Sequence, residues 1–372
     1  MKNEKIGFSE ALCILLIITI SHLVLTLPKT LLGSQGSGAL LNIIYVSILA
    51  LLFIFILMKL YKNFKGLDIL DISNFLFGKT FKFILGLAFI IYFMFVASLL
   101  IRNVSENIKT MYFQNTPIPF IMLFLLLAAG FINKLGIKTV IKCNLIIVPC
   151  ITILLLLLIS VNSVNFVTER IFPVFGYGIK NLFINGSSNI YAFGSIAFLF
   201  FLMPLLNSYE KFNKISYWYI GLASLLTILA IASLQLTFPL EIASGSNIPI
   251  YIQTRQISLG AFIQRTDVFF VLVWILTVLS YLSIILAFIL LIFKKITNIE
   301  DKSAISNCFL AILFGIGLLY PNILEARFLQ STVYKYFMLI LVFGISFLVL
   351  ALSNIKRIII NKKKGELIVE EK

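Results

Sequence analysis

Ten long apolar runs constrain what this chain can fold into more than any other feature of its sequence. Most of them approach or exceed the roughly 20 residues that a helix needs to cross a bilayer. The chain is 60% hydrophobic and only 12% charged, with a mean hydropathy of +1.07. A soluble domain carries about twice that charge, so we predict a polytopic integral membrane protein. The runs lie at about 9–32, 39–60, 82–101, 119–133, 140–160, 187–206, 215–236, 267–293, 305–320 and 335–355.

The lysines and arginines are distributed unevenly between these runs. An even number of spans places both termini on one side of the membrane, and 21 of the 30 basic residues fall on that side. Cytoplasmic segments carry the excess of Lys and Arg in membrane proteins, so this distribution predicts cytoplasmic termini. The formal net charge of +15 therefore indicates topology and anionic lipid head groups rather than nucleic acid.

Two of the predicted spans carry matching interruptions. The first contains Ser21-His22-Leu23 followed by Pro28, and the sixth contains Gly194-Ser195 followed by Pro204. Each of these spans opens one half of five spans. Discontinuous helices at matching positions of two inverted halves are typical of a transporter with a central binding site. The alternative is that glycine and proline are simply common in membrane helices.

We therefore expect one all-α transmembrane domain over 1–372, with ten helices in two inverted five-helix repeats. The repeats cover about 8–160 and about 187–356, and a solvated cytoplasmic tail follows at 357–372. Because five is an odd number, the second repeat enters the membrane from the opposite side. Two long connections have their own predictions. The segment 61–81 is amphipathic and is expected to lie on the membrane surface, and 237–266 is expected to fold over the outer mouth.

His22 is the only histidine of the chain and lies near the middle of the first span. Placing an ionisable group at membrane depth costs several kcal/mol, which favours a functional role for the segment. A simple hydrogen bond from His22 to a neighbouring helix is the alternative for the imidazole itself.

The predicted ligand site follows from the two interruptions. A broken helix exposes N–H groups that suit a carboxylate and carbonyl groups that suit an ammonium, so a zwitterionic amino acid fits. Nearby aromatic side chains can enclose the ligand, although each one taken singly is more often a packing residue. The predicted ligand-binding residues are Ser21, His22, Leu23, Tyr92, Phe95, Tyr191, Phe193, Gly194, Ser195 and Trp274.

The start of the eighth span carries two charged residues and, further along, two hydroxyls. Asp267 can cap the helix and pair with Arg265, although a capped helix end with an interfacial arginine accounts for both. Thr277 and Ser280 are candidate ligands for a cation, and hydrogen bonds back to their own helix are the alternative.

Signatures of soluble enzymes and of metal centres are missing from the sequence. The chain has no P-loop, no H-E-x-x-H and no G-x-S-x-G motif, and one histidine cannot build a metal cluster. We therefore predict no enzyme activity, no metal and no cofactor. The cysteines all lie in or beside apolar runs and are expected to be small buried hydrophobic residues rather than disulfides. They are Cys13, Cys143, Cys150 and Cys308.

Four passages resemble the B-subunit permease family of endospore nutrient-germinant receptors, a branch of the amino acid–polyamine–organocation transporters. They are the proline-containing end of the first span at 27–36, the stretch 170–178, the sixth span at 193–204, and the R-x-D-x-x-x-x-x-x-W segment at 265–274. The last is the most specific. Related transporters usually have a Gly-x-Gly-like break in the first span, where this chain has Ser21-His22-Leu23.

The resemblance implies a LeuT-like fold and a receptor subunit of the spore inner membrane. Such subunits bind a small germinant in a transporter-like pocket and work with an A-type subunit and a C-type lipoprotein subunit, and ligand binding leads to ion release. A proton- or cation-coupled amino acid permease that acts alone is the alternative function.

Overall fold

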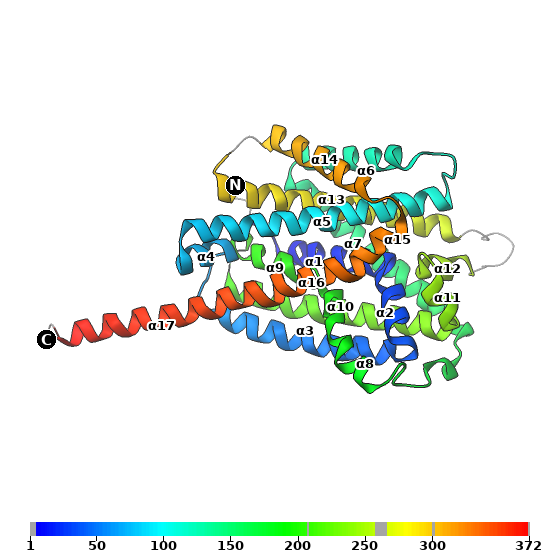
Figure 1. Ribbon diagram of the computed structural model, residues 1–372, viewed down its shortest axis with the longest axis horizontal. Coiled ribbons are helices and arrows are strands. Elements are labelled where there is room, and N and C mark those ends of the chain that lie inside the picture. Colours follow the sequence, from blue (N-terminus) through cyan, green and yellow to red (C-terminus); the bar gives the residue numbers. More distant parts are fainter. Residues whose placement is uncertain (1–4, 207, 257–265, 300–301, 371–372) are drawn as a thin grey trace.

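The protein is a bundle of helices, most of which run side by side along its longest axis (Figure 1). The computed structural model describes residues 5–206, 208–256, 266–299 and 302–370, and these residues contain no β-strand. The predicted all-α class is therefore confirmed. The tail predicted at 357–372 continues as helix, because α17 spans Ser346–Glu370 and projects beyond the bundle in Figure 1.

The helices follow one another with short connections. The first half contains α1 (Phe8–Leu25), α2 (Leu27–Gln35), η1 (Gly36–Gly38), α3 (Ala39–Tyr61), α4 (Ile69–Phe77), α5 (Lys79–Met111), α6 (Ile118–Lys134) and α7 (Ile137–Asn162). The middle contains η2 (Ser163–Asn165), η3 (Thr168–Ile171), α8 (Ile179–Phe183), η4 (Asn185–Phe193), α9 (Ile196–Leu202), η5 (Met203–Leu205) and α10 (Tyr209–Thr237). The last part contains α11 (Leu240–Gly245), α12 (Pro249–Arg255), α13 (Thr266–Thr297), α14 (Lys302–Leu319), α15 (Ile323–Leu329), η6 (Gln330–Tyr334), α16 (Lys335–Met338), η7 (Leu339–Ile345) and α17.

Seven helices of the described residues are long and apolar enough to cross a membrane, and a bent pair over 179–205 makes an eighth. Two shorter apolar helices, Ile118–Lys134 and Ala304–Leu319, occupy the fourth and ninth predicted spans. These were also the shortest runs in the sequence. All ten predicted positions are thus helical, and eight of them meet the length that a span requires.

The first span is broken, but not at the predicted residues. α1 continues without interruption through Ser21-His22-Leu23 and ends at Leu25, and Thr26 (φ −129°, ψ −24°) separates it from α2. Pro28 lies in the first turn of α2, where its missing N–H costs no helical hydrogen bond. In Figure 1, α2 runs across the bundle rather than along it. The break therefore follows the position of the proline rather than that of the small and polar residues.

The sixth span is broken at the predicted residues. The η4 and α9 helices meet at Gly194 and Ser195, and the two segments are bent by 45°. Pro204 lies in the first turn of η5, just after α9. The predicted pair of discontinuous helices, one and six, is therefore present.

α1 lies at the centre of the bundle, where it packs against α7, α10 and α13. It is apolar on every side, which is expected of a helix that is enclosed by others. In its apolar window 72% of the residues are buried, compared with 28% over Lys138–Asn165. Cys13 on α1 is buried, but the prediction of burial is wrong for Cys143, Cys150 and Cys308, which lie on the outside of the bundle.

The bundle has two ends that differ in structure. We call the end that carries α4 and the last turn of α13 the terminal end, because the N and C marks both lie on its side (left in Figure 1). The opposite end carries α2, α11, α12 and α15. Both long connections contain helices: α4 lies in the connection at the terminal end, and α11, in the other connection, packs against α2 at the opposite end. Residues 257–265 of that second connection lie outside the described residues.

Candidate ligand-binding site

Tyr334, in the tenth span, lies at the centre of a cluster of aromatic rings contributed by four other spans. The His22 ring stacks on it with centroids 5.8 Å apart, and Tyr92 stacks on it at 6.1 Å. Tyr191 approaches it edge-on at 6.1 Å. His22 Nε2 is also hydrogen-bonded to the Tyr281 hydroxyl at 2.9 Å. We call these five residues the Tyr334 cluster.

The break in the sixth span lies directly against this cluster. A Cβ atom placed on Gly194 would lie 2.5 Å from the Tyr334 hydroxyl and 3.7 Å from the Met338 sulfur. Contacts at 2.5 Å are far below van der Waals separation, so only glycine lets the backbone come this close to Tyr334. Gly194 therefore brings the broken backbone of the sixth span next to the aromatic rings.

A second polar group connects α1, the same break and α10. The Ser195 hydroxyl is hydrogen-bonded to the Thr19 hydroxyl at 2.8 Å and to the Tyr219 hydroxyl at 2.5 Å. All three side chains are almost fully buried. Buried hydroxyls are stable in a bundle interior only when they are paired, and this triangle pairs each of them.

The break in the first span is bonded to the tenth span. Gln330 donates from Nε2 to the Thr26 hydroxyl at 2.6 Å, and its Oε1 accepts from Asn103 Nδ2 at 2.9 Å. Gln330 opens η6, a π-helical segment that ends at Tyr334. Such segments are rare and occur frequently at functional sites. Three irregular backbone segments, in spans one, six and ten, therefore converge on the Tyr334 cluster.

Towards the terminal end, the interior is filled by phenylalanines. Phe93 packs on Phe198 with centroids 4.6 Å apart, and Phe198 packs edge-on against Phe288 at 5.0 Å. Phe89 and Phe201 join them at 4.8 Å. These five residues, which we call the phenylalanine cluster, come from α5, α9 and α13, and all of them are almost fully buried.

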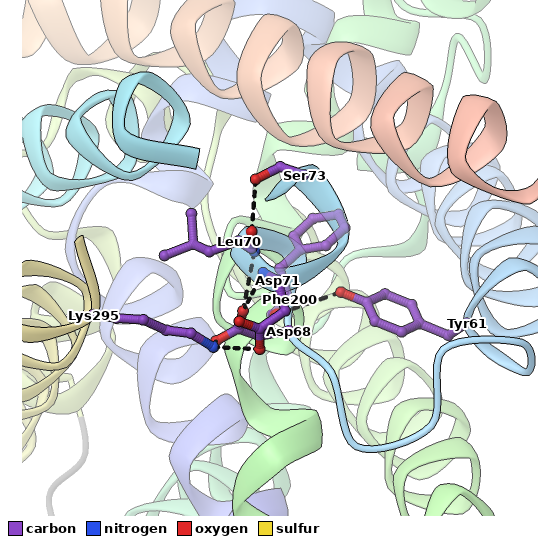
Figure 2. Close-up of polar contacts among 7 residues, drawn as sticks. All are labelled: Tyr61, Asp68, Leu70, Asp71, Ser73, Phe200 and Lys295. Carbon is purple, nitrogen blue, oxygen red and sulfur yellow. Dashed lines mark hydrogen bonds and ion pairs between the residues drawn. The ribbon is translucent and has the colours of Figure 1, made fainter. Parts of the chain in front are cut away.

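Beyond the phenylalanine cluster, a lysine joins α13 to α4 (Figure 2). Lys295 Nζ lies 2.5 Å from both Asp68 Oδ2 and Asp71 Oδ2. Asp68 also caps α4, because its Oδ1 accepts from the backbone N–H groups of Leu70 and Asp71 at 3.0 Å. In the same view, Tyr61 donates to the carbonyl of Phe200 on α9 at 3.3 Å.

Asp68 is the most deeply buried member of this ion-pair network, with 2% of its side chain exposed. Burial raises the pKa of the Asp68 carboxyl, because an ionised carboxylate loses its hydration there. The Lys295 ammonium opposes this shift. The network therefore depends on Lys295 to keep a buried carboxylate charged.

Six of the ten predicted ligand residues are thus brought together around the Tyr334 cluster and the neighbouring hydroxyl triangle. They are His22, Tyr92, Tyr191, Gly194, Ser195 and, beside His22 on α1, Ser21. Ser21 is fully buried, and its hydroxyl has no hydrogen-bond partner among the described residues.

The other four predicted ligand residues have less direct relations to the cluster. Leu23 and Phe193 are fully buried packing residues. Phe95 is partly buried one turn after Tyr92 on α5. Trp274 is 1% exposed, and its indole Nε1 has no hydrogen-bond partner in the described part of the chain.

The predictions for the eighth span have mixed outcomes. Thr277 donates to the carbonyl of Val273 at 2.8 Å, which is the hydrogen bond to its own helix that the sequence left open as the alternative. Ser280 is buried nearby on α13. Asp267 accepts from the Tyr251 hydroxyl of α12 at 3.2 Å. Arg265 lies outside the described residues.

Sequence reasoning missed Tyr334, which makes the most contacts in the cluster, and also Tyr281 and Tyr219, and it did not include Thr19 among the predicted ligand residues. The predicted tenth span began at 335, one residue after Tyr334. The four polar residues 330–332 and 334 just before that run were a usable signal, because polar side chains that enter a span are costly unless they serve a purpose.

This arrangement of broken helices around a central polar and aromatic site defines a transporter-type integral membrane protein. Solved structures of transporters share this fold. A Na⁺-coupled sialic acid symporter in a substrate-bound outward-open state is 12% identical and matches with a TM-score of 0.62, covering 91% of this chain and 79% of that one. A nucleobase-cation-symport-1 family transporter in a closed conformation, with bromovinylhydantoin bound, is 13% identical with a TM-score of 0.59, covering 88% and 75%.

Within this class, the chain belongs to the spore germination protein family, whose model matches residues 5–328. Spore germination protein B2 of Bacillus subtilis (strain 168) is 22% identical over 362 residues, which is 95% of this chain and 97% of that protein. Spore germination protein KB of the same organism is 19% identical over 282 residues, 74% of each. The family resemblance noted in the sequence is therefore confirmed, and the chain is a transporter-like membrane protein of spore germination.

Proposed function

We propose that this protein is the membrane subunit of a spore nutrient-germinant receptor and binds a small germinant, an amino acid by class, beside the Tyr334 cluster. The observation that carries the proposal is the close approach of Gly194 to Tyr334, where the interrupted sixth span meets the π segment of the tenth. Polar groups without partners also support a small polar ligand. Ser21 Oγ on α1 and Trp274 Nε1 on α13 are buried without a partner among the described residues, and His22, which stacks on Tyr334, keeps some accessible surface.

Binding at this site is proposed to trigger germination through other subunits. By the family resemblance, these are an A-type subunit and a C-type lipoprotein subunit in the spore inner membrane, with both termini of this chain in the cytoplasm. The uneven distribution of lysine and arginine supports that orientation. The phenylalanine cluster supports a sensing role. Its buried apolar rings would separate a bound ligand from the terminal end and would oppose passage of a polar ligand to that side.

The test uses the purified full chain and a panel of L-amino acids. At least one is expected to raise the thermal unfolding temperature of the wild type, since a ligand that binds only the folded state stabilises it. Gly194→Val is expected to lose that shift, because the new side chain would collide with the Tyr334 hydroxyl and displace the ring at the proposed site. In spores, the same variant is expected to accumulate normally and to lose the germination response.

Gly221→Val on α10 is the matched control, because a Cβ there would meet nothing within 4 Å. It is expected to keep the response. A full response in Gly194→Val would place the ligand elsewhere, and a panel in which no amino acid stabilises the wild type would exclude that ligand class.

The second candidate is a cation-coupled amino acid permease that acts alone. It is favoured by the shared fold with a Na⁺-coupled symporter. Proteoliposomes that contain this chain alone separate the two functions: concentrative uptake of the stabilising amino acid would favour the permease, and binding without uptake would favour the receptor.

A further inference from the structure

A pocket of about 340 Å³ opens at the opposite end, between α2 and α15. Gln330 and Thr26, which are hydrogen-bonded to each other, form part of its lining, and Tyr334 follows Gln330 by about one helical turn. The pocket is therefore a neighbour of the proposed germinant site but has its own residues. Its lining consists of Thr26, Lys29, Thr30, Gly33, Ser244, Leu324, Arg327, Phe328, Gln330 and Ser331.

Both charged residues in this lining are cations. Lys29 and Arg327 are close enough to repel each other electrostatically. Glu106 also acts on Arg327, but its carboxylate already forms an ion pair of 2.7 Å with Arg102. Two like charges next to a partly enclosed pocket are unfavourable unless an anion is bound between them.

The hydrogen bonds of Arg327 leave one edge of its guanidinium unused. Nη1 donates to Asn247 Oδ1 at 2.6 Å. Nε and Nη2 are buried and have no partner among the described residues. These two nitrogens share the edge that binds a carboxylate through two parallel hydrogen bonds, and buried guanidinium N–H groups are rarely left unpaired.

Lys29 contributes further donors. Its ammonium has three N–H groups, and one hydrogen bond, to the carbonyl of Gly245, is formed at 3.2 Å. Two donors on Lys29 and two on Arg327 match the acceptor sites of a single carboxylate group. Leu324 and Phe328 supply apolar surface for the rest of a small organic molecule, and the volume is at the small end of ligand pockets.

We propose that this pocket is a binding site for a small organic carboxylate, held by Arg327 through Nε and Nη2 and by Lys29 through its ammonium. Because the two guanidinium nitrogens are shielded from solvent, a rotation of Arg327 or of a neighbouring side chain accompanies binding. The site is distinct from the Tyr334 cluster, so its occupancy does not depend on the proposed germinant.

The experiment titrates the purified full-length protein with sodium propionate and follows binding by calorimetry. Propionamide, which has nearly the same shape but no charge, is the control ligand and is expected not to bind. Arg327→Gln is expected to weaken propionate binding on the order of tenfold to a hundredfold, the range for lost hydrogen bonds to a charged group. Lys29→Gln is expected to weaken it less, because the bidentate edge remains.

Two control variants separate this site from general charge and from the germinant site. Lys180→Gln removes an exposed positive charge that is not part of the pocket lining and is expected to bind propionate like the wild type. Gly194→Val is also expected to bind it normally. Absence of propionate binding to the wild type, equal binding by Arg327→Gln, loss of binding in Gly194→Val, or a preference for inorganic phosphate would each overturn the proposal.

Discussion

The ion pairs at the two ends of the bundle differ in what they join: the network at the terminal end links two helices, whereas Arg102–Glu106 at the opposite end lies within α5. At the terminal end, Lys295 bonds two carboxylates of α4, and the phenylalanine cluster fills the interior next to them. At the opposite end, the contact between spans one and ten is the neutral hydrogen bond of Gln330 with Thr26. Surface pockets at the two ends also differ in charge: Lys5, Lys65 and Glu210 line one at the terminal end, whereas the charged residues of the proposed carboxylate pocket at the opposite end, Lys29 and Arg327, are both cations.

This difference indicates which end opens more readily. Separating a buried ion pair leaves uncompensated charge in a poorly hydrated region, whereas a neutral hydrogen bond can be exchanged for water at much lower cost. We therefore expect helices at the opposite end to move first when a ligand enters. The terminal end is expected to stay closed until the Lys295 network is broken.

The largest expected effect is at the terminal end. Lys295→Met leaves Asp68 buried without its counter-ion and is expected to destabilise the protein by about 3 kcal/mol, the lower limit for a broken buried pair, because Lys295 and Asp71 are partly exposed. Thermal unfolding in detergent measures it. Lys62→Met, an exposed charge at the same end, is the matched control and is expected to change stability by less than about 0.5 kcal/mol. Equal effects of both variants would remove the contrast between the ends.

A smaller effect is expected at the opposite end. Gln330→Leu removes both side-chain hydrogen bonds of Gln330 and leaves Asn103 Nδ2 unpaired, which costs about 2 kcal/mol at most. Gln330→Glu is the companion variant: it keeps an acceptor oxygen for Asn103 Nδ2 but has no N–H to donate to Thr26, so it is expected to restore the first bond and not the second. If Gln330→Leu destabilised the protein more than Lys295→Met, the opposite end would be the more firmly closed one.

The smallest expected effect is a change with pH in the stability difference between Lys295→Met and the wild type, which tests the role of charge at the terminal end. Burial raises the pKa of Asp68, so the folded protein takes up this proton at a higher pH than the unfolded chain, and protonation favours the folded state as pH falls. Without Lys295 to oppose it, the shift is larger. The stability deficit of Lys295→Met relative to wild type is therefore expected to shrink by about 1 kcal/mol between pH 7.5 and pH 5. Unfolding at both pH values measures it, and a constant deficit would show that Asp68 does not carry the effect.

The amino-acid sequence by itself determined the membrane class, the positions of the helical spans and the break at Gly194 and Ser195. Hydropathy is a local property that needs no knowledge of the neighbouring helices. Gly194-Ser195, followed by Pro204 in the same apolar run, marks a break in the same local way. The family was also recognisable from short passages of sequence.

Only the tertiary structure decided which side chains meet. His22 and Tyr334, and Asp68 and Lys295, are separated by hundreds of residues, and their contacts depend on how complete helices cross. The break in the first span moved to Thr26, because α1 is enclosed by three helices and stays regular as far as Pro28 allows. In the sequence, Lys29 is indistinguishable from an ordinary cation at the end of a span, and Arg327 from an ordinary cation in a loop. Their shared pocket exists because α2 turns across the bundle and brings one to the other.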